Sequence, residues 1–178
     1  MKETINSERS TSSDADLSLK ETVQRAKAEF GHAKSRLVRA LETTPDDRLN
    51  WSPSSTSRTP LQLAAHCALS VHHMLGNMDG RTYAVPETAE ADRSHRRDET
   101  QFTTREQVLD LLEDNSAKYF AWLDGLTPEK LHGPMTLPFN FGTIPVSAGI
   151  PFMALHMMTH VAQIEYIQTI YGDHDWHL

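Results

Sequence analysis

The chain has 178 residues, a hydrophobic fraction of 38% and a formal net charge of -7, values that fit one domain with a single core. A nucleic-acid-binding face needs clustered Lys and Arg to displace counterions from phosphates. The short basic run Arg93–Arg97 is followed directly by Asp98 and Glu99, which largely cancel its field. We therefore expect no nucleic-acid partner.

The sequence predicts a cytoplasmic protein without a membrane partner. Its N-terminal residues lack the apolar stretch of a secretory signal, and no apolar run is long enough to cross a bilayer. Cys67 is the single cysteine, so an internal disulfide is excluded. We expect Cys67 to pack as a small apolar residue.

Residues 1–16 are rich in Ser, Thr and acidic side chains, which predicts a flexible tail before a single domain over residues 17–178. Apolar residues between Leu19 and Leu41 then recur at alternating steps of four and three. This spacing is typical of a helix that faces a bundle.

The second helix has a clear start, because Thr59 can cap it, Pro60 suits its first position and Gln62 completes a capping box. The apolar pattern continues to Met78. Residues 80–101 carry many charges without apolar periodicity and predict a long connection with at most a short helix.

A third helix is expected to open with a capping box of Thr103 and Glu106 and to stop at Gly125. A short helical turn follows at residues 127–129, and then loop or short extended structure over residues 132–146. The last helix is expected over residues 148–171. Together these elements predict an all-α four-helix bundle with long connections between helices 2 and 3 and between helices 3 and 4.

Two histidines lie on the inner face of the last helix. His156 and His160 are four residues apart, within about 40° of each other around the helix axis, and share the apolar stripe of Met153, Ile164 and Ile167. An unpaired buried polar group costs about 1–3 kcal/mol. One metal ion satisfies both rings; hydrogen bonds to carbonyls or to buried water are the alternative.

The second helix offers a third ligand. His66 lies on its polar side with Gln62, Ser70 and His73, whereas His72 projects closer to the apolar centre. The pattern alone does not choose between His66 and His72. We expect the other histidines at the surface, namely His32, His95, His132, His174 and His177.

Three segments resemble the DinB/YfiT-like metalloenzyme family. They are Trp51-Ser-Pro, the stretch from Thr59 to His66, and His156-Met-Met-Thr-His160-Val-Ala-Gln163 with its terminal Tyr171-Gly172. The resemblance covers roughly residues 18–172. It implies a four-helix bundle and a divalent metal, zinc or nickel with iron or manganese as alternatives, held by His66, His156 and His160. The resemblance thus selects His66 over His72.

The chain departs from the family at Met157, Thr159 and Ala162, where the family often has glutamate, histidine and glycine. These departures make the surroundings more apolar and bear on the substrate more than on the metal.

By resemblance, the ion is expected to activate a low-molecular-weight thiol, in an S-transferase or isomerase reaction, or a water molecule in hydrolysis. Gln163 is a candidate to orient a metal ligand or contact substrate, and the alternative is that it satisfies carbonyls of its own helix. His73 is a candidate to contact a small-molecule substrate. A non-catalytic metal-binding or ligand-binding protein is the competing hypothesis, and a homodimer is open in either case.

Overall fold

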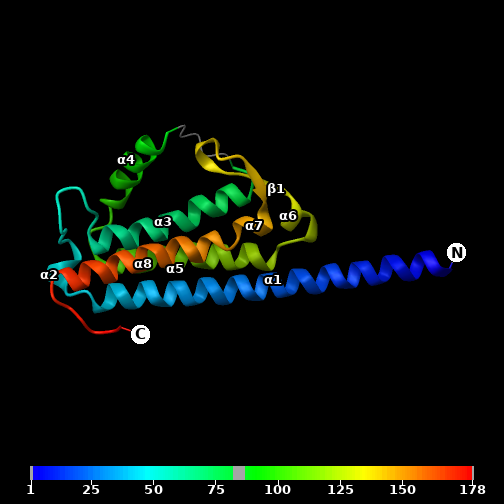
Figure 1. Ribbon diagram of the computed structural model, residues 1–178, viewed down its shortest axis with the longest axis horizontal. Helices are drawn as coiled ribbons and strands as arrows, with labels where there is room; N and C mark the ends of the chain where they lie inside the picture. The colour runs from blue at the N-terminus through cyan, green and yellow to red at the C-terminus, as the bar shows by residue number, and fades with distance from the viewer. Residues whose placement is uncertain (1, 82–86, 178) are drawn as a thin grey trace.

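Four long helices form a bundle in the computed structural model, which describes the backbone of residues 2–81 and 87–177 and the side chains of residues 17–81 and 87–177 (Figure 1). Among the described residues these helices are α1 (Lys2–Thr43), α3 (Pro60–Met78), α5 (Arg105–Asp124) and α8 (Phe152–Ile170). Helix α3 packs against α5 and α8, and α1 packs against α8 and α5. The predicted all-α four-helix bundle is confirmed.

Shorter elements occupy the connections between these helices. They are α2 (Asp46–Leu49), α4 (Thr88–Glu99), α6 (Pro128–His132), β1 (Pro134–Thr136), η1 (Pro138–Asn140), β2 (Thr143–Pro145) and α7 (Val146–Gly149). Helix α4 lies on the outer side of α3, with which it makes most of its contacts (Figure 1). Part of the predicted connection, residues 82–86, lies outside the described residues.

Helix α1 begins at Lys2, so the backbone is helical where the sequence predicts a tail. The flexibility of residues 1–16 stays a prediction. No helix within residues 2–81 and 87–177 combines the length and the apolar character that a membrane span requires.

Buried side-chain amides join α5 to α3 and α8 to α1. Asn115 of α5 donates a hydrogen bond of 3.0 Å to the Ala68 carbonyl of α3. Gln168 of α8 donates one of 3.1 Å to the Ala40 carbonyl of α1. Because a buried amide left without a partner is costly, these bonds favour one axial position of each helix against its neighbour.

The helix starts follow the sequence, with one shift. At α3, Thr59 and Gln62 form the predicted capping box. At α5 the box consists of Thr104 and Gln107 rather than the predicted Thr103 and Glu106. Both pairs have the same spacing, so sequence alone could not separate the two registers.

The predicted last helix is divided at Pro151. Helix α7 ends at Gly149, and α8 begins only at Phe152. Proline lacks an N–H and its ring crowds the preceding turn, so it cannot continue the helix that begins before it. The predicted start at residue 148 was therefore wrong by four residues.

Strands β1 and β2 form an antiparallel hairpin, which we call the hairpin (Pro134–Pro145). Its tip holds Phe139 and Asn140 at φ 58° each, in the left-handed region. Such a conformation costs on the order of 1–3 kcal/mol for a residue other than glycine and persists only where its surroundings impose it.

The register of the α5 cap can be tested by substitution. Thr104→Ala removes the side chain that accepts from the Gln107 amide, so it should lower the free energy of unfolding by about 1 kcal/mol. Thr103→Ala, the matched control, should change it by less than about 0.5 kcal/mol. Urea denaturation measures both, and a larger effect at Thr103 would contradict the observed cap.

Candidate metal centre

Three imidazoles converge between helices α3 and α8. His66 comes from α3, and His156 and His160 come from α8. Their ring centroids lie 5.2 Å (His66–His156), 4.8 Å (His66–His160) and 4.6 Å (His156–His160) apart. One ligand nitrogen of each ring lies within 4.8 Å of the other two. We call these residues the histidine cluster.

The cluster fits a divalent metal ion. At metal–nitrogen distances near 2.0–2.1 Å, a tetrahedral ion holds two ligand nitrogens about 3.3 Å apart. The observed separations reach that value through small side-chain adjustments. Three neutral imidazoles are also the donors that zinc and nickel accept.

Two rings of the cluster have their second nitrogen engaged. His66 Nδ1 lies 2.8 Å from a carboxylate oxygen of Glu99, and His160 Nδ1 lies 2.7 Å from Oε1 of Gln163. These acceptors favour the tautomer with the proton on Nδ1, which leaves Nε2 of each ring to bind a metal. His156 differs, because its Nε2 contacts the Ser70 hydroxyl at 3.2 Å.

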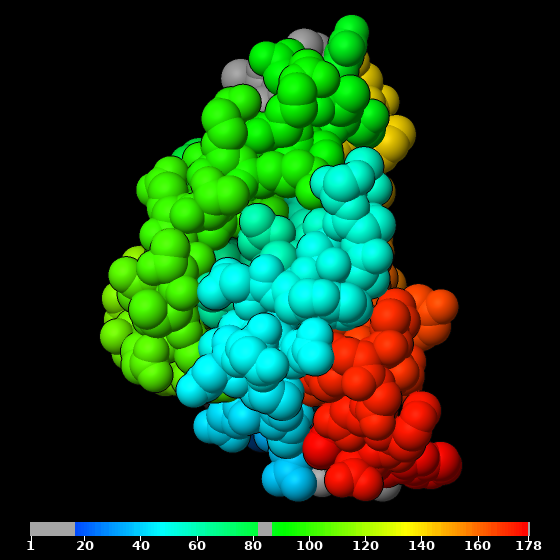
Figure 2. Space-filling view, turned by 90° about the vertical axis from the view of Figure 1, so that its left-hand side faces the viewer, coloured from blue at the N-terminus to red at the C-terminus, as the bar shows by residue number. Residues whose placement is uncertain are grey.

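Glu99 is the fully buried charge of the site. Its side chain is 0% exposed, and its other partner is Arg58, whose Nε and Nη2 donate at 2.7 and 3.0 Å. Arg58 also bonds Asp92 of α4 at 2.8 Å. Figure 2 shows the chain around residues 50–60, in cyan, lying between α4 and the end of α8. Arg58 belongs to this segment, and its bond to Asp92 joins the segment to α4.

The electrostatics keep His156 and His160 neutral and Glu99 charged. Burial lowers the pKa of His156 to about 3, with further lowering by His160 and His66. Burial likewise lowers the pKa of His160. Burial raises the pKa of Glu99, but the hydrogen bonds from His66 and Arg58 outweigh it and bring that pKa below its usual value. Neutral imidazoles beside a carboxylate suit a cation.

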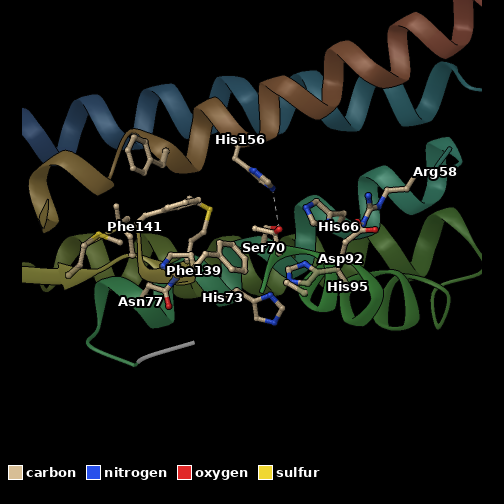
Figure 3. Close-up of a pocket in the computed structure, with 17 residues that line it drawn as sticks. Arg58, His66, Ser70, His73, Asn77, Asp92, His95, Phe139, Phe141 and His156 are labelled. Carbon is tan, nitrogen blue, oxygen red and sulfur yellow. Dashed lines mark hydrogen bonds and ion pairs between the residues drawn. The ribbon is translucent and has the colours of Figure 1, made fainter. Parts of the chain in front are cut away.

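A cavity of about 680 Å³ opens beside the cluster (Figure 3). His66, Ser70 and His156 line one part of it, and the rings of Phe139 and Phe141, 5.9 Å apart, line another part. The remaining wall comes from α3, α4, the hairpin and the start of α8. Its volume is within the range of small-molecule sites.

Glu99 and His95 were missed by the sequence reasoning. His95 was expected at the surface, but it lines the cavity with its ring 5.2 Å from that of His66. Together His66, His95 and Glu99 form a second group with ligand atoms within 4.8 Å of one another. Both residues lie in the charged part of α4, a stretch that the sequence, with its many charges and no apolar periodicity, predicted to be a connection.

The other predicted residues are distributed between the site and the surface. His73 lines the cavity, and burial lowers its pKa to about 4, with further lowering by His95 and His72. His72 is exposed, whereas Cys67 is buried in the core as expected. Burial and the nearby Glu99 raise the pKa of the Cys67 thiol, so it is no nucleophile at neutral pH.

Of the remaining histidines, His32, His132 and His174 are exposed as expected. His177, which was also expected at the surface, is only partly exposed. Its Nε2 lies 2.9 Å from Asp173, and its carbonyl accepts a hydrogen bond from Arg36.

The sequence matches the family model of the DinB superfamily over residues 29–164. This range covers most of the chain and includes all three members of the histidine cluster. The chain therefore belongs to the DinB superfamily. No curated protein matches it.

Solved structures share the fold at low sequence identity. YfiT from Bacillus subtilis, described as a probable metal-dependent hydrolase with an unusual four-helix bundle topology, is 20% identical with a TM-score of 0.67, covering 86% of this chain and 89% of YfiT. A DinB-like protein from the same organism is 16% identical with a TM-score of 0.60, covering 85% of this chain and 94% of that one.

A third structure, the mycothiol-dependent maleylpyruvate isomerase, is 14% identical with a TM-score of 0.66. The similarity covers 80% of this chain but only 60% of the isomerase. At these identities the likeness establishes the bundle and its topology.

Glu99 is expected to set metal affinity through His66. Glu99→Gln removes the carboxylate that fixes the His66 ring, and should weaken zinc binding by about 10- to 100-fold in a chelator competition. Asp92→Asn is the matched control, because Asp92 bonds Arg58 but no member of the histidine cluster, and should change the affinity much less. Equal effects of the two variants would contradict a specific role of Glu99.

The metal-free protein should lose stability in mild acid. Unfolded His156 takes up a proton near pH 6.5, whereas the folded residue stays neutral down to about pH 3. The unfolded state therefore binds more protons within that window, and the free energy of unfolding falls as the pH falls. Between pH 7.5 and 5 we expect a loss of about 1–2 kcal/mol by urea denaturation.

His156→Gln should show a smaller loss over the same pH range, because the titrating ring is absent. A wild-type stability that stays constant from pH 7.5 to 5 would contradict the assignment.

Proposed function

We propose that this protein is a metal-dependent enzyme in which His66, His156 and His160 hold one divalent ion that activates a thiol or a water molecule. The single observation that carries the proposal is the convergence of three imidazoles from α3 and α8 beside a cavity of ligand size. Zinc and nickel are the proposed metals, since both accept a set of neutral nitrogen ligands.

When bound, the ion supplies a Lewis acid that lowers the pKa of a coordinated water or thiol and so provides a nucleophile at neutral pH. The protein supplies the orientation of the ligands. Glu99 and Gln163 hold His66 and His160 by their Nδ1 atoms. The Glu99 carboxylate also balances part of the charge of the ion, while Arg58 keeps that carboxylate ionised.

The apolar walls of the cavity help to exclude water from the proposed site. Apolar side chains of the hairpin and of α8 line the cavity, including Leu137, Phe139 and Phe152. A site of low polarity strengthens the field of an ion on a bound substrate. An apolar site also favours the transfer of an organic reactant from bulk water into the cavity.

The relatives support both reaction classes. YfiT is described as a probable metal-dependent hydrolase, and the isomerase with the same fold is described as mycothiol-dependent. A low-molecular-weight thiol and an electrophilic acceptor are therefore the first substrates to test, and simple esters the second.

Metal content tests the proposed centre. Untagged wild type reconstituted with zinc should retain about one equivalent by elemental analysis, and His160→Ala should lose it. His72→Ala is the matched control, because His72 lies on the same helix as His66 but is exposed and outside the histidine cluster. It should retain the metal.

Turnover separates an enzyme from a binding protein. Zinc- or nickel-loaded wild type should consume a thiol with an electrophile, or hydrolyse an ester, and both His160→Ala and the chelator-treated protein should lose that activity. Loading with one equivalent but no turnover in either assay would favour a non-catalytic metal-binding protein. Absence of metal in the reconstituted wild type would remove the basis of the proposal.

A further inference from the structure

The cavity has two chemically different ends. One end is polar and holds His66, Ser70 and His156, close to Arg58 and Asp92 (Figure 3). Beside Asn77 and His73, the other end is built mainly from thioether, aliphatic and aromatic side chains (Figure 3). These are Met74, Met135, Leu137, Pro138, Phe139, Phe141 and Phe152. A ligand that fills the cavity therefore meets polar groups at one end and an apolar wall at the other.

The apolar wall is held in place by the hairpin and its anchor. Met135 of β1 is buried and packs so closely on Gly149 that a Cβ there would lie 2.2 Å from the Met135 sulfur. The Leu137 amide donates to the Gly142 carbonyl at 2.9 Å and closes the hairpin tip. The base of the hairpin thus packs on α7, and its tip is closed by its own hydrogen bond.

Within this tip, Phe139 has a backbone conformation that is unfavourable for a bulky side chain. Its φ of 58° and ψ of 28° lie in the left-handed region, and Asn140 follows in the same region. This conformation directs the Phe139 ring to the cavity, where it contacts Phe141 at a centroid distance of 5.9 Å. Strain retained at a cavity wall indicates a role in binding.

The same wall exposes apolar surface to solvent. Phe141 is 70% exposed and Phe152 is 40% exposed, although both line the cavity. Exposed aromatic side chains gathered around one opening are typical of a ligand site.

We propose that the cavity selects a substrate with an alkyl or aryl group, which packs against Phe139 and Met74 while its polar reacting end lies at His66 and His156. This proposal rests on the proposed function for the position of the reacting end. The apolar selectivity belongs to the hairpin and α3 and does not require a metal.

A homologous series of ligands tests the two parts separately. Linear primary amides and linear hydroxamates of two to eight carbons share the same chains, but only the hydroxamates chelate a metal. In zinc-loaded wild type, both series should bind up to about fourfold tighter per added methylene in NMR titrations. The hydroxamates should bind tighter than the amides at every length.

Two variants remove the apolar wall without removing a member of the histidine cluster. Phe139→Asn deletes the ring but suits the left-handed backbone, and Met74→Gln replaces the thioether on a helix with a polar group of similar length. In each variant, the factor by which the affinity rises per added methylene should fall at least twofold for both series of ligands. Trp176→Asn, an exposed aromatic residue outside the cavity, should leave it unchanged.

The outcomes distinguish the two proposals. If the affinity of wild type does not rise with chain length, or if both folded variants keep the full increment, apolar selection is wrong. If the increment is present but hydroxamates and amides bind equally well, apolar selection stands and the metal centre is wrong. Thermal melting confirms that each variant is folded.

Discussion

The site depends on one buried carboxylate. Glu99 is completely removed from solvent, and an ionised carboxylate in that position is stable only if its oxygens are satisfied. Arg58 and His66 satisfy them from two different parts of the chain. The tautomer of His66, the position of α4 and the course of the loop that carries Arg58 all follow from this one requirement.

The histidines of α3 and α8 are held in position by different kinds of partner. The ring of His66 is fixed by a charged residue on another helix, whereas the ring of His160 is fixed by Gln163, one turn further along α8. His156 has the Ser70 hydroxyl of α3 as its partner, which joins the two helices directly. Two of the three contacts therefore depend on tertiary structure, and only one is local.

Local contacts are the ones that sequence reveals. The cap of α3 and the inward pair of His156 and His160 could be predicted, because capping and helical periodicity act within a few residues. Glu99 could not, because its partners are 33 and 41 residues away and its neighbours form a charged run. For the same reason periodicity left His66 and His72 equivalent. The family resemblance favoured His66, and in the structure packing against α8 and α4 separates the two residues.

Helix α4 both lines the cavity and positions the His66 ring. Its residues Thr88, Ala91 and His95 face the cavity, and its last residue, Glu99, holds the ring of His66. The size of the cavity and the orientation of the His66 ring therefore both depend on this one helix of twelve residues. A tilt of α4 that enlarged the cavity would also move the carboxylate bound to His66. Under the proposed function, the size of the cavity and the affinity for the metal would therefore change together.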